Sequence, residues 1–196
     1  MIRLRRVRQD VAGQSMMEFA IVMPILVIVA MGVVDLGNAL LNQHIVTKLT
    51  REGSNLISRD VDLIDAATAL RTMASGPVDF DNGSTVIFSV LKRGGTTGTP
   101  NYNRLILYRR YTVGTLPATS TIATAGSGSF GGPPNFEAAN SDHDTRLRVT
   151  NLPADLVATP GGLLYVTEIF TRHQTLTPLD RFGITLPQRL YSIAYF

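Results

Sequence analysis

Phe19–Leu41 reads FAIVMPILVIVAMGVVDLGNALL and contains a single charged residue, Asp35. The 16 residues before Asp35 show no polar stripe of the kind that marks the solvent face of a core helix in a small domain. At 23 residues the segment also exceeds the ~20 that a helix needs to cross a bilayer. These properties predict a membrane-inserted helix near the N-terminal end of the chain.

A basic tail lies directly before the apolar segment. Its arginines are Arg3, Arg5, Arg6 and Arg8, and Asp10 is the one acid among the first ten residues. These residues account for the whole net charge of +3, because the remaining basic and acidic side chains are equal in number. Positive charge before the span predicts a cytoplasmic N-terminus and an extracytoplasmic C-terminal domain. A charge confined to a tail argues against a basic face for nucleic acid.

The overall composition fits one domain attached to this helix. The chain has 196 residues, and a typical domain takes ~100–200. It contains no cysteine, which excludes a disulfide framework, a thiolate zinc site and a cysteine nucleophile.

A short motif stands between the tail and the apolar segment. It reads GQSMMEF, beginning with Gly13 and Gln14 and ending with Glu18 and Phe19. It resembles the processing site of type IV pilin-like proteins, in which a prepilin peptidase cuts after the glycine and leaves the apolar helix on the mature protein. The resemblance implies that residues 1–13 are a cleaved leader and that the mature chain begins at Gln14. It also implies that Glu18 pairs with the N-terminal amine of a neighbouring subunit; the alternative is a carboxylate that merely sits at the interface near a helix N-terminus.

A longer segment, Gly13–Gly53, resembles the TadE-like minor pseudopilins of the tight-adherence, or Flp-type, pilus machinery. The residues that carry this resemblance are Glu18-Phe19-Ala20, Pro24, Gly32, Asp35, Gly37 and Arg51-Glu52-Gly53. It implies a minor pseudopilin that takes part in assembly or initiation of a pilus. The residues expected to act in subunit assembly are Glu18, Phe19, Pro24 and Asp35.

The same resemblance implies partners and a location. The expected partners are the prepilin peptidase, other pseudopilins and pilins, the inner-membrane platform proteins of the pilus, and membrane lipid. The expected location is the bacterial inner membrane, crossed once, and whether the chain enters the filament stays open. No cofactor, metal or enzymatic activity is implied.

Pro24 lies inside the expected span. A proline removes one helix hydrogen bond, so we expect a kink or a local loosening. Prolines are tolerated in membrane helices, and a bend would equally help the helix to pack in a filament. Both interpretations stay open.

Past the apolar segment, residues 42–76 are expected to form a helical stalk and a second helix. Apolar residues at helical spacing, such as Ile45 and Leu49, predict that the first helix continues out of the membrane. Gly53 is a candidate break in it. The second helix is predicted over Asp62–Ala74, because an aspartate precedes it and Ser75-Gly76-Pro77 ends it.

The remaining residues, 77–196, are expected to form an antiparallel β domain. Short β-branched or aromatic segments bounded by Gly, Pro or Asn predict five strands: Thr85–Lys92, Arg104–Tyr111, Arg146–Leu152, Leu163–Thr171 and Arg189–Tyr195. Helices followed by strands predict an α+β fold: a transmembrane helix over 14–41 that continues into the domain, a second short helix and a small antiparallel sheet. The resemblance implies that this architecture is pilin-like.

An uncharged insert interrupts this β domain. The 26 residues between Arg110 and Glu137 carry no charge and are rich in Thr, Ser, Gly, Ala and Pro. Such a composition predicts a flexible loop over residues 111–136. A partner-binding or glycan-bearing surface loop is the alternative.

The sequence offers no credible catalytic or metal-binding motif. Asp142-His143-Asp144 is more typical of a solvated turn than of a metal site, and Asp79–Gly83 departs from the spacing of a calcium loop. Two alternatives to the TadE-like interpretation remain: an uncleaved, signal-anchored extracytoplasmic binding or enzymatic domain, and a minor pseudopilin of a type II secretion system.

Overall fold

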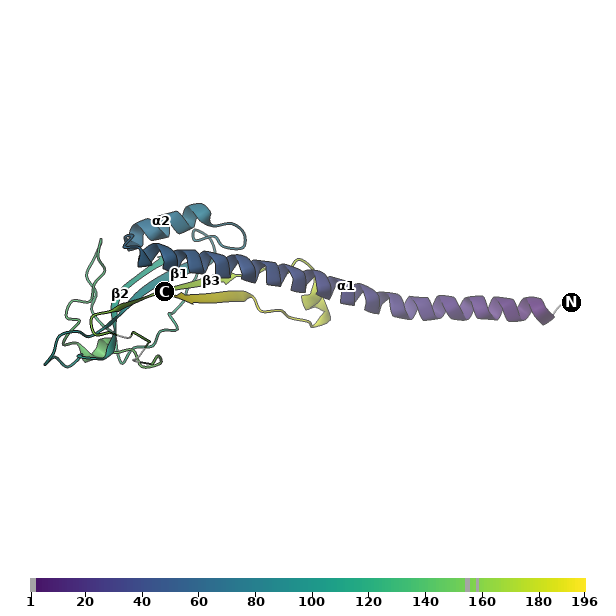
Figure 1. Cartoon of the computed structure of the whole chain (residues 1–196). Coiled ribbons are helices and arrows are strands. Elements are labelled where there is room, and N and C mark those ends of the chain that lie inside the picture. Colours follow the sequence, from purple (N-terminus) through teal and green to yellow (C-terminus); the bar gives the residue numbers. More distant parts are fainter. Residues whose placement is uncertain (1–2, 154–155, 158) are drawn as a thin grey trace. The chain divides into compact units, whose positions relative to one another are not determined.

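The computed structural model describes residues 3–153, 156–157 and 159–196, with the side chains of residues 3–12 left out (Figure 1). Met1 and Ile2 of the predicted leader lie outside the described residues. In the described residues, these helices and strands follow one another: α1 Arg3–Ser58, α2 Leu63–Met73, β1 Ser84–Arg93, β2 Leu105–Gly114, η1 Thr145–Leu147, β3 Leu163–Arg172, η3 Leu179–Phe182 and β4 Arg189–Tyr195. The predicted long first helix and short second helix are therefore confirmed.

The four strands form one antiparallel sheet in the order β2-β1-β3-β4. β1 and β3 are central, and their registers pair Phe88 with Thr167 and Ile87 with Glu168. The predicted α+β class is thus confirmed, with four of the five predicted strands in place. The fifth, Arg146–Leu152, is wrong: this segment holds η1 and two isolated bridges, at Arg148 and Val149.

One face of the sheet packs against the helices. The helical core cluster is the buried cluster that joins these elements: it contains Val46 and Leu49 of α1, Leu70 of α2, Phe88 of β1 and Ile169 of β3. In Figure 1, α2 lies along the part of α1 that covers the sheet. α2 begins after Asp62, as predicted, and its apolar spacing places Leu63, Ala66, Ala67 and Leu70 in the core.

Gly53 does not break α1, contrary to the prediction. The helix continues through it to Ser58, and Gly53 lies where α1 packs tightly against β3 and α2. A Cβ placed on Gly53 would lie 2.9 Å from Cγ2 of Thr167 and 3.0 Å from Cδ1 of Leu70. The glycine thus provides space for packing.

The opposite face of the sheet is covered by irregular chain. Leu91, Leu107 and Val166 from the strands share a second buried cluster with Ile122 and Val157 from the connecting segments. Within the segment predicted to be a flexible loop, residues 111–114 belong to β2, and Leu116 and Ile122 are buried. Its flexibility stays a prediction, to be tested by the exchange rates of its backbone amides.

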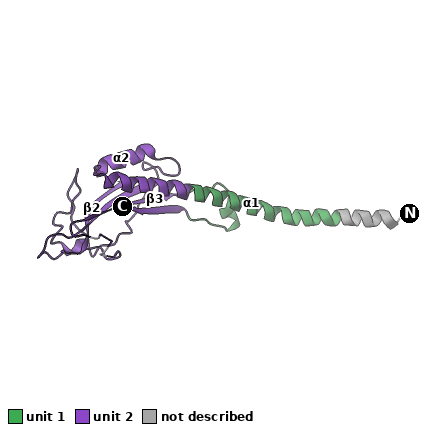
Figure 2. Cartoon of the chain, in the orientation of Figure 1, with its two compact units in different colours: residues 1–41, 174–187 green, residues 42–173, 188–196 purple. Residues whose placement is uncertain are grey.

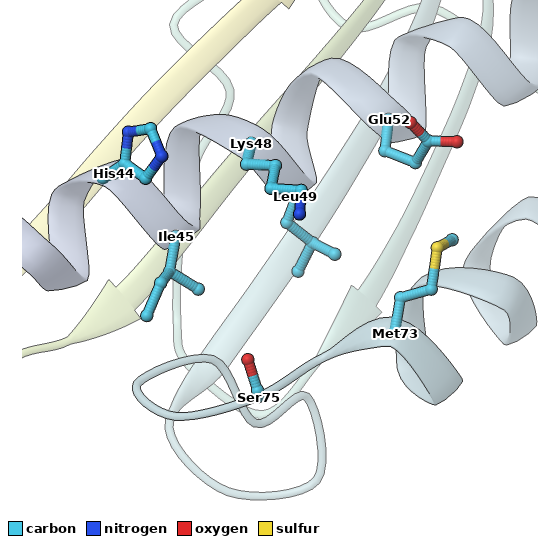
Figure 3. A pocket seen from close by; sticks show the side chains of 7 residues that line it. All are labelled: His44, Ile45, Lys48, Leu49, Glu52, Met73 and Ser75. Atoms are coloured by element: carbon cyan, nitrogen blue, oxygen red, sulfur yellow. The ribbon is translucent and has the colours of Figure 1, made fainter.

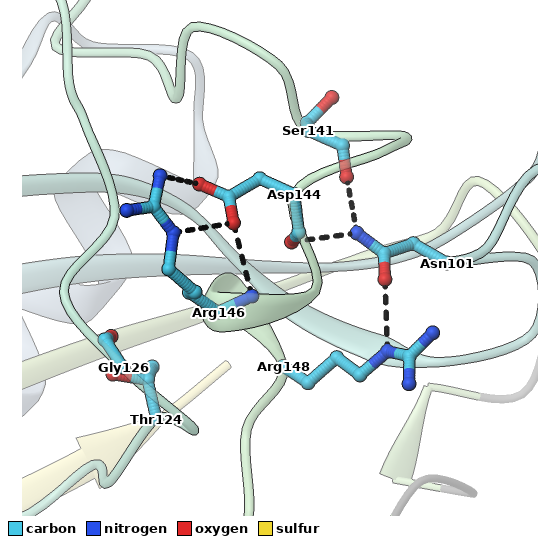
Figure 4. A network of polar contacts seen from close by, with 7 residues as sticks. All are labelled: Asn101, Thr124, Gly126, Ser141, Asp144, Arg146 and Arg148. Carbon is cyan, nitrogen blue, oxygen red and sulfur yellow. Dashed lines mark hydrogen bonds and ion pairs between the residues drawn. The ribbon is translucent and has the colours of Figure 1, made fainter.

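A polar network ties the connecting segments together (Figure 4). Asn101 is buried; it donates to the carbonyls of Ser141 and Asp144 and accepts from the guanidinium of Arg148. Arg146 donates to the Asp144 carboxylate from its side chain and its backbone amide. These hydrogen bonds hold the pKa of the Asp144 carboxyl below its ordinary value and fix the turn that begins η1.

The chain divides into two compact units (Figure 2). Unit 1 comprises residues 1–41 and 174–187, and unit 2 comprises residues 42–173 and 188–196. Unit 2 therefore contains α2, the whole sheet and the helical core cluster, whereas unit 1 contains the apolar part of α1 and the loop that carries η3.

Candidate functional site

The candidate site is the surface of α1 in unit 1. From Gly13 to Leu41 most side chains are exposed, and nearly all of them are apolar. The large exposed ones include Met16, Met17, Phe19, Ile21, Val22, Ile25, Leu26, Val29, Val33, Leu36, Leu40 and Leu41. Monomeric soluble proteins rarely expose apolar patches beyond a few hundred Å². This surface is therefore suited to contact with lipid or with other apolar helices.

Among the described residues, one helix, Gly13–Ser58, is long and apolar enough to cross a membrane by length and composition. A helix rises 1.5 Å per residue, so Phe19–Leu41 extends for about 35 Å. That length covers the hydrocarbon core of a bilayer, about 30 Å. The helix fits a single-pass membrane anchor.

The structure brings Gln14 and Glu18 together at the start of the apolar surface. They lie one helical turn apart, and the Gln14 side-chain amide donates to Oε1 of Glu18 at 3.1 Å. Both side chains are exposed, as is Phe19 with 63 % of its surface accessible. Gly13 precedes them within α1; apart from its chain neighbours and the nearby helix backbone, no described atom lies within 4 Å of a Cβ built on it. The predicted processing and pairing residues thus occupy one accessible stretch of helix.

Pro24 lies ten residues after Gln14 and does not interrupt α1. Its ring nitrogen has no hydrogen to donate to the carbonyl of Ala20, so this turn of helix lacks one bond. The apolar surface therefore continues across it.

Asp35 is the buried exception on this surface, with none of its area accessible. Its carboxylate accepts hydrogen bonds from the backbone amides of Leu176, at 2.7 Å, and Thr177, at 3.1 Å. The Thr177 hydroxyl donates to the other carboxylate oxygen. Three donors from the loop 174–187 compensate a carboxylate that burial alone would destabilise. Sequence reasoning singled out Asp35 as a lone charge in an apolar run, but its loop partners carry no comparable signal.

A second buried carboxylate, Glu168, lies in unit 2 on the sheet face turned away from α1. It accepts from the Thr121 amide at 2.8 Å, from the Thr121 hydroxyl at 2.6 Å and from the Tyr191 hydroxyl at 3.1 Å. The Ser120 hydroxyl donates to its other oxygen. The sequence analysis did not identify Glu168, although a single acid within an otherwise apolar strand could have drawn attention to it.

Charge and burial in this network shift the pKa values of two further side chains, Arg110 and Tyr191. Burial lowers the pKa of the Arg110 guanidinium, and the Glu168 carboxylate partly opposes that shift. Burial also raises the pKa of the Tyr191 hydroxyl, with Glu168 adding to the rise. Arg110 donates to Ser89, Ser120 and Ile122, so it joins the sheet to the same covering segment. The network holds the segment onto the sheet through mutually satisfied polar groups.

A groove of about 450 Å³ lies between α1 and the end of α2 (Figure 3). Its lining residues are His44, Ile45, Lys48, Leu49, Glu52, Met73 and Ser75. Its charged side chains, Lys48 and Glu52, both come from α1, and α2 contributes Met73. Such a mixture of charged and apolar side chains is also common on ordinary surfaces.

Among the described side chains, no group of three or more His, Cys, Asp or Glu residues is placed to hold a metal ion. The Asp142-His143-Asp144 turn uses its carboxylates for contacts within the chain, since Asp142 accepts from Thr96 and Asp144 from Arg146. His143 is exposed.

Comparison with known proteins concerns the apolar helix. The model of the family described as TadE-like protein matches residues 13–55. No curated protein and no solved structure matches the chain. The matched segment contains Gln14, Glu18, Pro24 and Asp35 and ends beyond Gly53. The resemblance predicted over Gly13–Gly53 is therefore confirmed, and this segment of the chain is similar to TadE-like proteins.

Proposed function

We propose that this chain is a minor pseudopilin of a tight-adherence pilus, anchored in the inner membrane by α1 after cleavage at Gly13. The TadE-like match supports a role in the tight-adherence pilus machinery. The observation that carries the finer proposal is the apolar surface of residues 13–41, which is exposed in the isolated chain. Such a surface associates with the helices of other pilins or platform proteins within the membrane.

Cleavage after Gly13 fits the properties of that position. Gly13 lies inside α1, and a peptide bond must leave the helix to enter a protease active site. Glycine disfavours the helix by about 1 kcal/mol relative to alanine, so unwinding costs least there. The basic tail stays on the cytoplasmic side, which places the peptide bond at the inner membrane face.

Glu18 is proposed to pair with the N-terminal amine of a neighbouring subunit. In the uncleaved chain its carboxylate accepts a hydrogen bond from the Gln14 side chain. Cleavage would make Gln14 the first residue and create a positive amine at the same end of the helix. An ionised carboxylate within lipid is costly by a few kcal/mol. Pairing with a neighbour's amine offsets that cost and selects the register between helices.

The first test measures processing. Co-expression with the prepilin peptidase is expected to reduce the mass of the chain by that of residues 1–13, as measured by intact mass spectrometry. Gly13→Ala is expected to abolish this loss, because an added methyl group hinders close approach of the peptidase and strengthens the helix. Gly37→Ala, in the same helix, is the matched control and should be processed normally. An intact N-terminus in the wild-type chain would refute the processing proposal.

The second test measures assembly. Glu18→Ala is expected to reduce pilus number and the co-purification of other pilins at least tenfold, because the amine of the neighbour loses its counter-charge. Glu52→Ala removes an exposed acid from the same helix beyond the apolar segment and should leave both quantities unchanged. Normal assembly of the Glu18→Ala chain would show that the carboxylate merely sits at the interface.

A further inference from the structure

The loop 174–187 exposes large apolar side chains in unit 1. Leu176 is 68 % exposed, Phe182 55 % and Ile184 44 %. Leu179, by contrast, is buried and anchors η3. Gly183 follows in the left-handed conformation, with φ of 77°, and ends η3 between Phe182 and Ile184. The loop thus exposes three large apolar side chains, while the buried Leu179 anchors it.

Asp35 fixes where this loop lies along α1. The amides of Leu176 and Thr177 bond directly to its carboxylate, so the exposed Leu176 side chain lies at the same level of the helix. Glu18 and Asp35 are 17 residues apart, about 25 Å along the axis. This distance approaches the ~30 Å hydrocarbon thickness of a bilayer. A helix with Glu18 at the inner boundary therefore has Asp35, and the loop bonded to it, at the outer boundary.

We propose that the loop 174–187 is a membrane-interface anchor, whose Leu176, Phe182 and Ile184 side chains insert among the lipids of the outer leaflet beside α1. The proposal rests on the proposed function in one respect, the insertion of α1 in the membrane. It adds a second lipid-binding element, which lies about 140 residues after Asp35 in the sequence.

The chemistry of the loop favours lipid over water or a polar partner. Among its 14 residues only Asp180 and Arg181 are charged. Amphipathic segments bury apolar side chains about 5–10 Å deep at the boundary of headgroups and acyl chains, where backbone groups still find water. The exposed Arg181, next to Phe182, is suited to a headgroup phosphate. Lipid also surrounds the boundary of any membrane helix, whereas a protein partner would have to be recruited to it.

The absence of tryptophan from the sequence allows a direct measurement. Phe182→Trp introduces a single fluorophore at the proposed contact in the full-length chain. The chain is reconstituted in vesicles of phosphatidylcholine and phosphatidylglycerol that carry bromine either close to the headgroup or near the end of the acyl chain. Val27→Trp serves as the reference within the span, and Tyr102→Trp, on unit 2, serves as the aqueous reference.

We expect the Phe182→Trp emission to shift to shorter wavelength and to be quenched mainly by bromine close to the headgroup. Val27→Trp should be quenched mainly by bromine near the chain end, and Tyr102→Trp by neither. If Val27→Trp is quenched while Phe182→Trp is not, the loop proposal is wrong and the membrane span stands. If Val27→Trp is not quenched, the span itself is wrong. Protection of the Phe182→Trp fluorophore by a second copy of the chain, detected by cross-linking, also overturns the lipid contact.

A second variant tests the role of Asp35 in holding the loop. Asp35→Ala in the Phe182→Trp chain removes the acceptor for three loop donors and is expected to abolish the preference for bromine close to the headgroup. Asp180→Ala removes an exposed carboxylate from the loop itself and should preserve that preference. Equal quenching in the two double variants would show that Asp35 does not position the loop.

Discussion

At the scale of single residues, the glycines of α1 differ between its exposed apolar part and the part that packs on the sheet. In the exposed apolar part of the helix, Gly32 and Gly37 have open space where a Cβ would lie. Gly53, in contrast, stands against Thr167 of β3 and Leu70 of α2. The same residue type is thus dispensable for packing within unit 1 and required for it in unit 2.

Gly53→Val is therefore expected to destabilise unit 2 by about 1–3 kcal/mol, the usual cost of overpacking a core. The better helix propensity of valine offsets only a few tenths of a kcal/mol. The measurement is the urea midpoint of the full-length chain in detergent micelles, followed by far-UV circular dichroism. Gly37→Val, in open space on the same helix, should leave the midpoint unchanged. Equal midpoints for Gly53→Val and the wild type would contradict the close approach of α1 to the sheet.

At the scale of elements, the regular structure could be predicted where local pattern and tertiary context agree. The strand predicted over Thr85–Lys92 is β1 with one residue added at each end, and Arg189–Tyr195 coincides with β4. β-branched and aromatic residues recur there, and a neighbouring strand is available on the sheet. α2 was predictable because its apolar residues recur at helical spacing between an aspartate and a Gly-Pro turn.

Arg146–Leu152 failed as a strand because side-chain hydrogen bonds compete with sheet formation in this segment. Asp144 accepts from the Arg146 amide and so begins a 3₁₀ turn where the strand was expected. Arg148 then reaches β2 through one isolated bridge, to Ile106. Capping of this kind depends on one short-range side chain, and a β-branched pattern does not reveal it.

The sequence pointed to the charged residues of the candidate site, but it did not reveal the distant residues that bind them. Glu18 and Asp35 attract attention in the sequence because a charge in an apolar run is costly and requires a partner. The partner of Asp35 is a loop 141 residues away at Leu176, and three of the four donors to Glu168 come from an uncharged segment, with Thr121 47 residues away. Such pairings follow from chain topology, which neither periodicity nor composition encodes.

At the scale of the whole molecule, the two units differ in what stabilises them. Unit 2 contains the helical core cluster and the sheet, so its apolar residues are buried by contacts within the unit. Unit 1 contains an exposed apolar helix and a loop fixed to it through Asp35. Removal of residues 1–41 should therefore affect the two units differently.

A chain of residues 42–196 is expected to fold in water with a cooperative thermal transition, because its buried clusters remain complete. The loop 174–187, deprived of the Asp35 carboxylate, should lose protection of the Leu176 and Thr177 amides against hydrogen exchange. The amides of β1 and β3, which pair within unit 2, should exchange as slowly as in the full-length chain in micelles, which is the control. Retained protection at Leu176 would show that the loop is held by something other than Asp35. Loss of protection in β1 and β3 would show that unit 2 depends on the membrane helix for its fold, and that the boundary near Leu41 does not separate independent units.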